Sequence, residues 1–465
     1  MEVSQNEPPG ENVIINKMKK QTKTYQLINE EENLTKAILV AVCTDGEPNS
    51  EEFVHALEEM QDLIEACDME VVRWVTQVYQ TPHPATYVGE GKLEEIKEYA
   101  ALYGAQMVVT LDNLSPSQLK NIGDIVDVPV MDRTSLILEI FSKRAKTREA
   151  RLQVELANLK YSLPRLVGMR KNLGRQAGAS GTLSNKGAGE KQIDLDRRRI
   201  ERRITQLERE LKEIEYNRET QRKSRERGNL PKVALVGYTN AGKSTVMNRI
   251  MEMSGQDEEK KVFEKDMLFA TLDTTVRRVS TKDKRDFLLS DTVGFISDLP
   301  HDLIRAFHST LEEVCFADLL LIVIDISDSH FKDQLAVTEN TLKELSADMV
   351  PRLYVYNKVD KLEADPENGV VTFKPGTVSG DRLYISAANG GGLDVLIESI
   401  KRNVYSSNEL LKLLVPYSQG SVAGKIRANA VVLKEEYRED GIYFEIDCPG
   451  YLSGSLKENP DLRFF

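Results

Sequence analysis

The segment that most constrains the fold is a glycine-containing loop between an apolar run and a stretch suited to a helix. Residues 232–236 read Lys-Val-Ala-Leu-Val, and the eight residues that follow satisfy the pattern GxxxxGK[ST]. Glycines at both ends let the backbone curve so that successive N–H groups point into the loop, where they can donate to phosphate oxygens. The pattern therefore predicts a phosphate-binding loop. A chance glycine-rich turn is the alternative, and the strand–loop–helix context argues against it. The loop consists of Gly237, Tyr238, Thr239, Asn240, Ala241, Gly242, Lys243 and Ser244.

A second motif lies where the other side of such a phosphate site is expected. Asp291 and Gly294 bound the tetrapeptide Asp-Thr-Val-Gly, 48 residues after Lys243 and directly behind the strand-like run 287–290. We expect Lys243 to contact the β- and γ-phosphates, Ser244 to ligate Mg²⁺, Asp291 to support that metal and the Gly294 N–H to approach the γ-phosphate. A buried capping aspartate explains an isolated DxxG equally well, so the prediction depends on order and spacing.

A third motif indicates which base is bound. Asn357, Lys358, Val359 and Asp360 follow the strand-like run 352–356. A carboxylate such as that of Asp360 accepts from both N1–H and the 2-amino group of guanine, whereas adenine lacks the amino group and has a lone pair at N1. ATP would therefore leave a buried charge unpaired. Lys358 is expected to lie along the base, and Asn357 to connect this loop to the phosphate loop. A further guanine contact through a backbone N–H is expected at Ser386, Ala387 and Ala388.

The segment between the first two motifs offers hydroxyl groups as a second metal ligand. On spacing alone Thr271, Thr274 and Thr275 all qualify. The residue after Gly294 is Phe295, which cannot hydrogen-bond an attacking water as the glutamine of many GTPases does. We therefore expect slow intrinsic turnover that needs outside help or another residue. A plain core role for Phe295 is compatible with this expectation.

The net charge of −12 conceals a strong asymmetry along the chain. Between Lys143 and Arg227 there are 24 Lys and Arg against 12 Asp and Glu, a local balance of +12 that leaves −24 for the remainder. A solvated helical face is the usual explanation of a charge run. Here the positive charge gathers in the glycine-rich segment 167–192, whose only acid is Glu190, and this favours binding to RNA phosphates.

Periodicity divides the chain into five parts. Residues 1–35 are polar and are expected to be a disordered extension. Alternating strand-like and helix-like segments over 36–132 predict a small parallel α/β domain. Residues 133–227 are expected to form an antiparallel helical hairpin, from a helix Thr134–Leu166 and a helix Asp196–Arg225 with heptad leucine and isoleucine seams, joined by a mobile tip at 167–192. The P-loop GTPase domain is expected at 228–405 and a small α+β domain at 406–465.

Composition excludes several other classes of protein. The apolar runs are strand-sized, which argues against a membrane span, and the polar N-terminus lacks the features of a secretion signal. The four cysteines form no CxxC pair, and the five histidines show no ligand spacing, so a metal hydrolase is not indicated. We expect a monomeric cytoplasmic protein, part of it associated with membranes, that does not bind DNA.

The ordered motifs GYTNAGKS, FATLD, DTVGF, NKVD and SAA, behind an α/β domain and a basic hairpin, resemble the HflX family of ribosome-associated GTPases. Further similarities are Val88-Gly-Glu-Gly-Lys-Leu, Asp132-Arg-Thr and Gly187-Ala-Gly-Glu-Lys-Gln. The resemblance covers Lys36 to the C-terminus. It implies a GTPase that binds the large ribosomal subunit and its rRNA, splits stalled or idle ribosomes, and is stimulated by the ribosome. The family is also credited with ATP binding through its N-terminal part, where this sequence shows no phosphate loop.

The resemblance also assigns residues. It implies Mg²⁺ on Ser244 and Thr271, and catalytic roles for Lys243, Thr271 and Gly294. It extends the GTP contacts beyond the phosphate loop to Phe269, Ala270, Thr271, Leu272 and Asp273, to Asp291, Thr292, Val293 and Gly294, to Asn357, Lys358, Val359 and Asp360, and to Ser386, Ala387 and Ala388.

Two departures from the family pattern bear on function. Asp273 is followed directly by Thr274, where the family commonly has proline, so the backbone there is less restricted. The hairpin loop reads Gly187-Ala188-Gly189-Glu190 where Gly-Pro-Gly-Glu is usual, which suggests a specialised paralogue. Action on drug-stalled ribosomes is one hypothesis for its task. A regulatory GTPase whose hairpin recruits a protein partner is the rival hypothesis.

Overall fold

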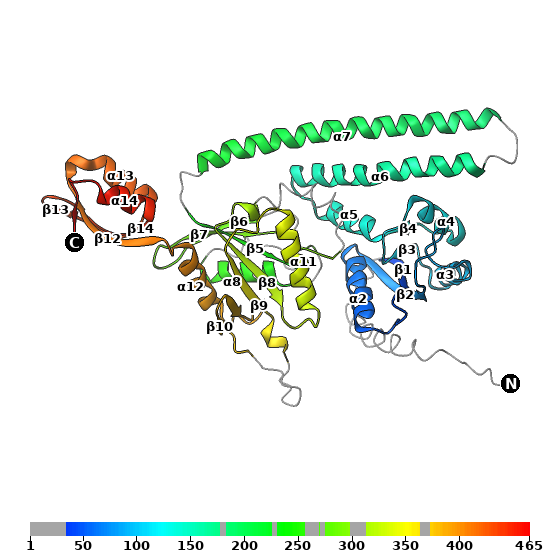
Figure 1. Ribbon diagram of the computed structural model, residues 1–465, viewed down its shortest axis with the longest axis horizontal. Coiled ribbons are helices and arrows are strands. Elements are labelled where there is room, and N and C mark those ends of the chain that lie inside the picture. Colours follow the sequence, from blue (N-terminus) through cyan, green and yellow to red (C-terminus); the bar gives the residue numbers. More distant parts are fainter. Residues whose placement is uncertain are drawn as a thin grey trace. The chain divides into compact units, whose positions relative to one another are not determined.

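The computed structural model describes residues 34–176, 183–225, 230–255, 269, 275–297, 313–362 and 373–465, with side chains of 166–194, 217–229 and Tyr451 not described (Figure 1). The chain divides into two compact units, Met1–Lys143 with Ala157–Thr205, and Arg144–Leu156 with Gln206–Phe465. Within the described residues, no helix has the length and apolar character required to cross a membrane.

The first unit contains a parallel sheet with strand order β2-β1-β3-β4. Seven consecutive residues of β1 are buried, the continuous apolar pattern of a strand covered on both faces. The predicted parallel α/β domain is therefore confirmed. Its elements are β1 (Thr35–Cys43), α2 (Glu51–Ala66), β2 (Met69–Val78), α3 (Glu90–Tyr103), β3 (Met107–Thr110), α4 (Pro116–Val126) and β4 (Val130–Met131).

The expected long helix over Thr134–Leu166 is wrong, because the structure has two helices there. These are α5 (Arg133–Arg144) and α6 (Arg148–Gln176). The Thr147 hydroxyl accepts from the Ala150 N–H at 3.1 Å, which is the bond of an N-cap and starts a new helix. A periodic apolar pattern runs through such a break, so the sequence pattern did not reveal it.

Helix α6 and helix α7 (Leu183–Arg225) form the predicted antiparallel hairpin (Figure 1). Near the base Arg148 pairs with Glu210 at 3.2 Å, and the seam residues Leu152 and Leu207 are buried. Helix α6 continues through residues 167–176, and helix α7 already includes residues 183–192. The irregular tip expected over 167–192 is therefore wrong for these two stretches. Extending an existing helix avoids the nucleation cost, which offsets the cost of single glycines. Residues 177–182 lie outside the described residues.

The motif Asp132-Arg133-Thr134 has a structural explanation within the first unit. The buried Asp132 carboxylate accepts from the Ser135 N–H at 3.1 Å, which caps α5, and pairs with Arg165 of α6 at 2.6 Å. Arg133 pairs with Glu59 of α2 at 2.8 Å. Both charged residues are buried with partners, so this motif connects α6 to the sheet domain.

The second unit contains a seven-stranded sheet of order β10-β11-β9-β8-β5-β7-β6, in which β11, β9, β8, β5 and β7 are parallel. Their carboxyl ends share one edge, and β5 lies where the strand order reverses, the usual ligand position in such sheets. The elements are β5 (Lys232–Gly237), α8 (Lys243–Met253), β6 (Thr275–Val279), β7 (Phe287–Asp291), β8 (Leu319–Asp325), α11 (Phe331–Glu344), β9 (Arg352–Asn357), β10 (Val378–Ser379), β11 (Arg382–Tyr384) and α12 (Leu393–Val404).

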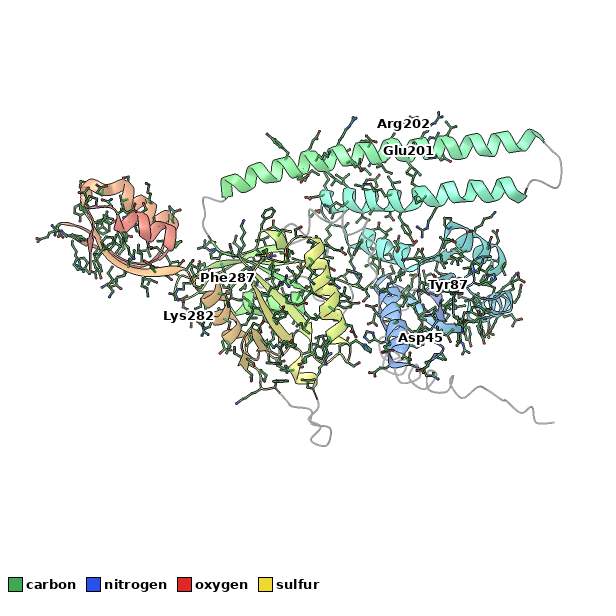
Figure 2. All side chains as sticks on the ribbon, viewed as in Figure 1. Asp45, Tyr87, Glu201, Arg202, Lys282 and Phe287 are labelled. Atoms are coloured by element: carbon green, nitrogen blue, oxygen red, sulfur yellow. The ribbon has the colours of Figure 1, made fainter. Side chains whose placement is uncertain are left out.

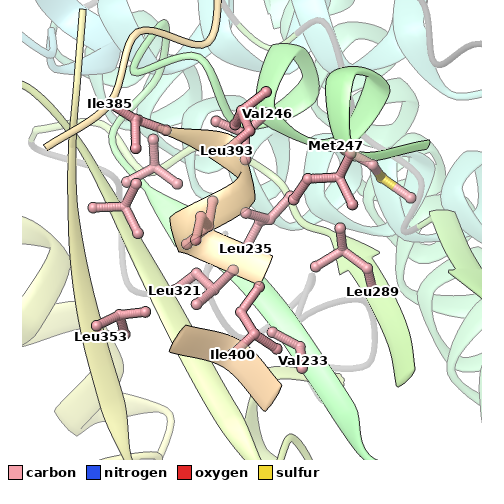
Figure 3. Packing of buried hydrophobic residues seen from close by; sticks show 14 of the residues in the cluster. Val233, Leu235, Val246, Met247, Leu289, Leu321, Leu353, Ile385, Leu393 and Ile400 are labelled. Atoms are coloured by element: carbon pink, nitrogen blue, oxygen red, sulfur yellow. The ribbon is translucent and has the colours of Figure 1, made fainter. Parts of the chain in front are cut away.

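One buried apolar cluster holds α8 and α12 against this sheet. Val233 and Leu235 of β5, Val246 of α8 and Ile400 of α12 are all fully buried in it (Figure 3). Phe287 of β7 belongs to the same cluster (Figure 2). Because α8 and β5 share this core, the loop between them is held at both ends.

The C-terminal elements follow the order β-α-β-β-α-β, with strand order β13-β14-β12-β15 and antiparallel pairing throughout. This is the split β-α-β arrangement of ferredoxin-like domains, and it confirms the expected small α+β domain. The elements are β12 (Asn408–Val415), α13 (Gly420–Asn429), β13 (Val431–Arg438), β14 (Gly441–Pro449), α14 (Gly450–Lys457) and β15 (Arg463–Phe464).

The turn between β6 and β7 contacts this C-terminal domain. Arg285 Nε pairs with the buried carboxylate of Asp447 on β14 at 2.7 Å, and Lys284 Nζ donates to the Val432 carbonyl at 3.1 Å. Asp283 of the same turn pairs with Lys401 of α12 at 2.9 Å. The hairpin that carries Asp291 at one end is thus connected to the C-terminal domain at the other.

We predict that Arg285→Ala lowers the free energy of unfolding by about 1–3 kcal/mol, because Asp447 stays buried without its cation. Urea denaturation followed by circular dichroism measures the change. Lys282→Ala removes an exposed lysine from the same turn (Figure 2) and should leave the midpoint unaltered. Equal midpoints for the two variants would contradict a stabilising role for the Arg285–Asp447 pair.

Candidate functional site

The loop between β5 and α8 has a backbone that only glycine permits at two positions. Gly237 has φ +149, and a Cβ there would lie 2.2 Å from the Val323 carbonyl oxygen. Gly242 has φ +93, and a Cβ there would lie 2.4 Å from Asn357 Nδ2. Helix α8 begins at Lys243 without a side-chain cap. Its first N–H groups are therefore not capped by a side chain and suit an anion.

Lys243 is buried, with 7% of its surface exposed. Its ammonium donates to the carbonyl oxygens of Gly237 at 3.1 Å and Tyr238 at 2.7 Å. Burial lowers the pKa of Lys243 to about 8, while the negative charge of Asp291 acts in the opposite direction. An anionic ligand in this loop would favour the charged form and strengthen its own binding.

The predicted metal-side residues lie together. Ser244 Oγ donates to Asp291 Oδ2 at 2.7 Å, and Asp291 is fully buried at the end of β7. A hydroxyl and a carboxylate are oxygen donors of the kind Mg²⁺ prefers. Across the described residues there is no group of three or more His, Cys, Asp or Glu side chains suited to a metal. The Ser244 hydroxyl and the Asp291 carboxylate are oxygen donors that fit a Mg²⁺ ion held jointly with phosphates.

The base-recognition loops are joined by Asn357. Its Nδ2 donates to the Ala241 carbonyl at 3.0 Å, and its Oδ1 accepts from the Ala387 N–H at 3.0 Å. Asp360 lies in the short helix Val359–Lys361 and accepts from Ser386 Oγ at 2.5 Å. The Asp360 carboxylate is otherwise exposed, so it remains accessible to a base.

The segment after Asp291 packs directly on the phosphate loop. Thr239 N donates to the Phe295 carbonyl at 2.8 Å, and Phe295 N donates to the Gly237 carbonyl at 3.1 Å. The Tyr238 hydroxyl accepts from the Ser297 N–H at 2.9 Å and lies 2.7 Å from Ser297 Oγ. Phe295 is 3% exposed, and this burial is compatible with a plain core role.

Most of the predicted site residues meet at one edge of the sheet. The phosphate loop, Asp291–Gly294, Asn357–Asp360 and Ser386–Ala388 all follow strands β5, β7, β9 and β11. Phe269 is buried, with φ +54. Its neighbours Ala270, Thr271, Leu272 and Asp273, and the competing Thr274, lie outside the described residues. Thr275 is the first residue of β6 and pairs with Asp291 in the antiparallel register.

Two contacts of the site were not predicted from the sequence. Lys358 Nζ pairs with Asp325, the last residue of β8, at 2.7 Å, and Arg249 of α8 donates to the Ala388 carbonyl at 2.9 Å. Asp325 directly follows a buried apolar strand, a signal that could have identified it. Arg249 carries no such signal, because an exposed basic residue on a helix is common.

Three family models match successive parts of the chain. A model described as "GTP-binding GTPase N-terminal" matches residues 54–142, one described as "GTP-binding GTPase Middle Region" matches 144–225, and one described as "50S ribosome-binding GTPase" matches 232–358. Together they cover most of the chain from the parallel sheet domain through the β9 motif.

Individual relatives show the same similarity. GTPase HflX of Caldanaerobacter subterraneus is 42% identical over 415 residues, covering 89% of this chain and 91% of that protein. GTPase HflX of Escherichia coli is 39% identical over 392 residues, covering 83% and 87%. A solved GTP-binding protein of Sulfolobus solfataricus in complex with GDP is 24% identical, with coverage of 80% and 99% and a TM-score of 0.43. Identities of 42% and 39% to the two HflX proteins, over 89% and 83% of this chain, show that the chain belongs to the HflX family of GTPases and is a GTP-hydrolysing enzyme.

Proposed function

We propose that this GTPase binds the large ribosomal subunit and uses GTP binding and hydrolysis to split or rescue stalled or idle ribosomes. The GTP site at the carboxyl edge of the second-unit sheet supports the nucleotide half of the proposal. The basic hairpin supports the ribosomal half, together with the match of residues 232–358 to a family described as ribosome-binding. The observation that carries the nucleotide half is Asn357, which joins the phosphate loop to the base loops.

In the proposed site each loop has a separate task. Asp360 accepts hydrogen bonds from the guanine edge, and Lys358, held by Asp325, lies along the base. The N–H groups at the start of α8 and the Lys243 ammonium bind the phosphates. Ser244 and Thr271 would hold Mg²⁺ with support from Asp291. When bound, that ion would neutralise charge on the β- and γ-phosphates.

Hydrolysis by the isolated protein is expected to be slow. The position after Gly294, which in many GTPases orients the attacking water, holds a phenylalanine whose side chain is buried and whose backbone is bonded to the phosphate loop. The N–H groups at the start of α8 and Lys243 can position the phosphates, and the Gly294 N–H can approach the γ-phosphate. None of these groups orients the attacking water. Stimulation by a ribosomal partner is consistent with this arrangement.

The hairpin supplies the surface for the ribosomal partner. Arg198 and Arg202 lie one turn apart on α7 and are exposed, and Arg202 projects from the helix in Figure 2. Nearby, Arg197 pairs with Glu201 at 2.8 Å, so part of the positive charge is locally neutralised. The excess of 12 positive charges over 143–227 already counts every acidic residue of that segment, and it suits rRNA phosphates.

We predict that Asp360→Asn lowers GTP affinity about a hundredfold and removes the preference for GTP over ATP. The amide accepts through one oxygen only and carries no charge, so two charge-assisted hydrogen bonds to guanine are weakened. Isothermal titration calorimetry with both nucleotides measures the effect. Asp381→Asn is the matched control, since Asp381 is exposed and directly precedes β11, away from the carboxyl edge. An unaltered preference in Asp360→Asn would exclude the assigned base site.

We predict that affinity for large ribosomal subunits falls steeply with salt, by ~0.7–0.9 log units per log unit of salt for each phosphate contact. Subunits should also stimulate GTP turnover in the wild-type protein. Replacing Arg170, Lys171 and Arg175 by alanine should reduce both effects, whereas alanine at the exposed Lys97, Lys282 and Lys425 should not. Salt-independent binding without stimulation would favour the rival hypothesis, in which the hairpin recruits a protein partner.

A further inference from the structure

One side chain of the phosphate loop is buried without a hydrogen bond. Thr239 is 6% exposed, and in the part of the chain that the structure describes its hydroxyl has no hydrogen-bond partner. A buried hydroxyl without a partner destabilises a fold, and such groups are rare in native proteins. The Thr239 hydroxyl therefore calls for an explanation in terms of function.

The surroundings of Thr239 are those of the γ-phosphate. The point where a Cβ on Gly294 would lie is 2.9 Å from Thr239 Cγ2 and 3.0 Å from Lys243 Nζ. Lys243 and Gly294 are the two groups expected to contact the γ-phosphate. The Cα and methyl group of Thr239 thus lie next to the point where Gly294 and Lys243 come together, and the hydroxyl is carried on the same Cβ as that methyl.

The neighbouring polar groups are already engaged. The Thr239 N–H donates to the Phe295 carbonyl, and the Phe295 N–H donates to the Gly237 carbonyl. The Tyr238 hydroxyl is bonded to Ser297. The backbone position of Thr239 is therefore fixed by a bond that does not involve its hydroxyl, and the hydroxyl remains available for a ligand.

We propose that the Thr239 hydroxyl is a catalytic group that donates a hydrogen bond to the γ-phosphoryl group during its transfer to water. This inference rests on the proposed GTP site. In the reaction a water oxygen bonds to the γ-phosphorus, the bond from that phosphorus to the bridging oxygen breaks, and GDP leaves with the bridging oxygen. The water protons remain with the products, and Thr239 neither gains nor loses a proton. Its hydrogen bond stabilises negative charge on the transferred group, a task separate from orienting water.

The test compares Thr239→Val, which keeps the shape without the hydroxyl, with Thr239→Ser, which keeps the hydroxyl. At saturating GTP, single-turnover hydrolysis by Thr239→Val should be about tenfold slower, whereas Thr239→Ser should stay within about threefold of wild type. GDP affinity of Thr239→Val, measured with a fluorescent GDP analogue, should change less than about twofold because GDP has no γ-phosphate. Thr338→Val, a buried threonine on α11 whose hydroxyl donates to Gln334 of its own helix, is the matched control.

A stability measurement distinguishes this role from a structural one. Without nucleotide, Thr239→Val should melt about 2 °C higher than wild type, because the substitution removes a buried hydroxyl that lacks a partner. A structural hydroxyl would give the opposite sign. Slower hydrolysis together with higher stability is the combination that the proposal requires.

Two results would overturn the proposal. Hydrolysis by Thr239→Val at the wild-type rate would show that the hydroxyl has no part in the reaction. A parallel loss of GDP affinity and melting temperature would show that it serves only to hold the loop. Failure of the wild-type protein to bind either guanine nucleotide would instead overturn the proposed GTP site, so the two failures are distinguishable.

Discussion

The site depends on one side chain, the carboxamide of Asn357. It donates to the Ala241 carbonyl in the phosphate loop and accepts from the Ala387 N–H in the loop after β11. Three loops from three strands are thereby held at fixed distances. Because Asn357 is 2% exposed, both bonds lie away from water, where an unpaired amide would be costly. The spacing between the loop after β5 and the loops after β9 and β11 follows from this residue and from Gly242, which lets it approach.

The β6–β7 hairpin gives the same site a mechanical connection. Asp291, at one end, accepts from Ser244, and the turn at the other end contacts the C-terminal domain through Arg285 and Lys284. The strands pair continuously from Thr275 with Asp291 to Val279 with Phe287. The hairpin therefore connects the Asp291 end of the site to the Arg285–Asp447 pair through an unbroken strand pairing.

Two buried polar side chains at the loop between β5 and α8 have surroundings that do not favour a stable fold. Lys243 is held among carbonyl groups with a lowered pKa, and Thr239 carries a hydroxyl without a partner in the described chain. Both arrangements cost stability in the protein without nucleotide, and under the proposed function bound phosphates would offset that cost. Proteins commonly place such costs at their ligand sites. The Asp132–Arg165 pair shows the contrasting case, since its two opposite charges meet at 2.6 Å and connect two elements.

The sequence alone determined the chemistry of the site and the class of each domain. Motif order identified the residues at the carboxyl ends of β5, β7, β9 and β11, since each follows an apolar strand and polar residues at such ends share one edge in a parallel sheet. Tertiary structure alone decided which groups touch across loops. Arg249 with Ala388 and Tyr238 with Ser297 are pairs distant in sequence, and local patterns contain no information about them. The buried strand before Asp325 marks that residue, but it does not reveal the pairing with Lys358. The break between α5 and α6 and the helical glycine-rich segment were mispredicted for a related reason. Periodicity and propensity report local preferences, whereas a cap at Thr147 and the extension of existing helices depend on specific hydrogen bonds and on neighbouring structure.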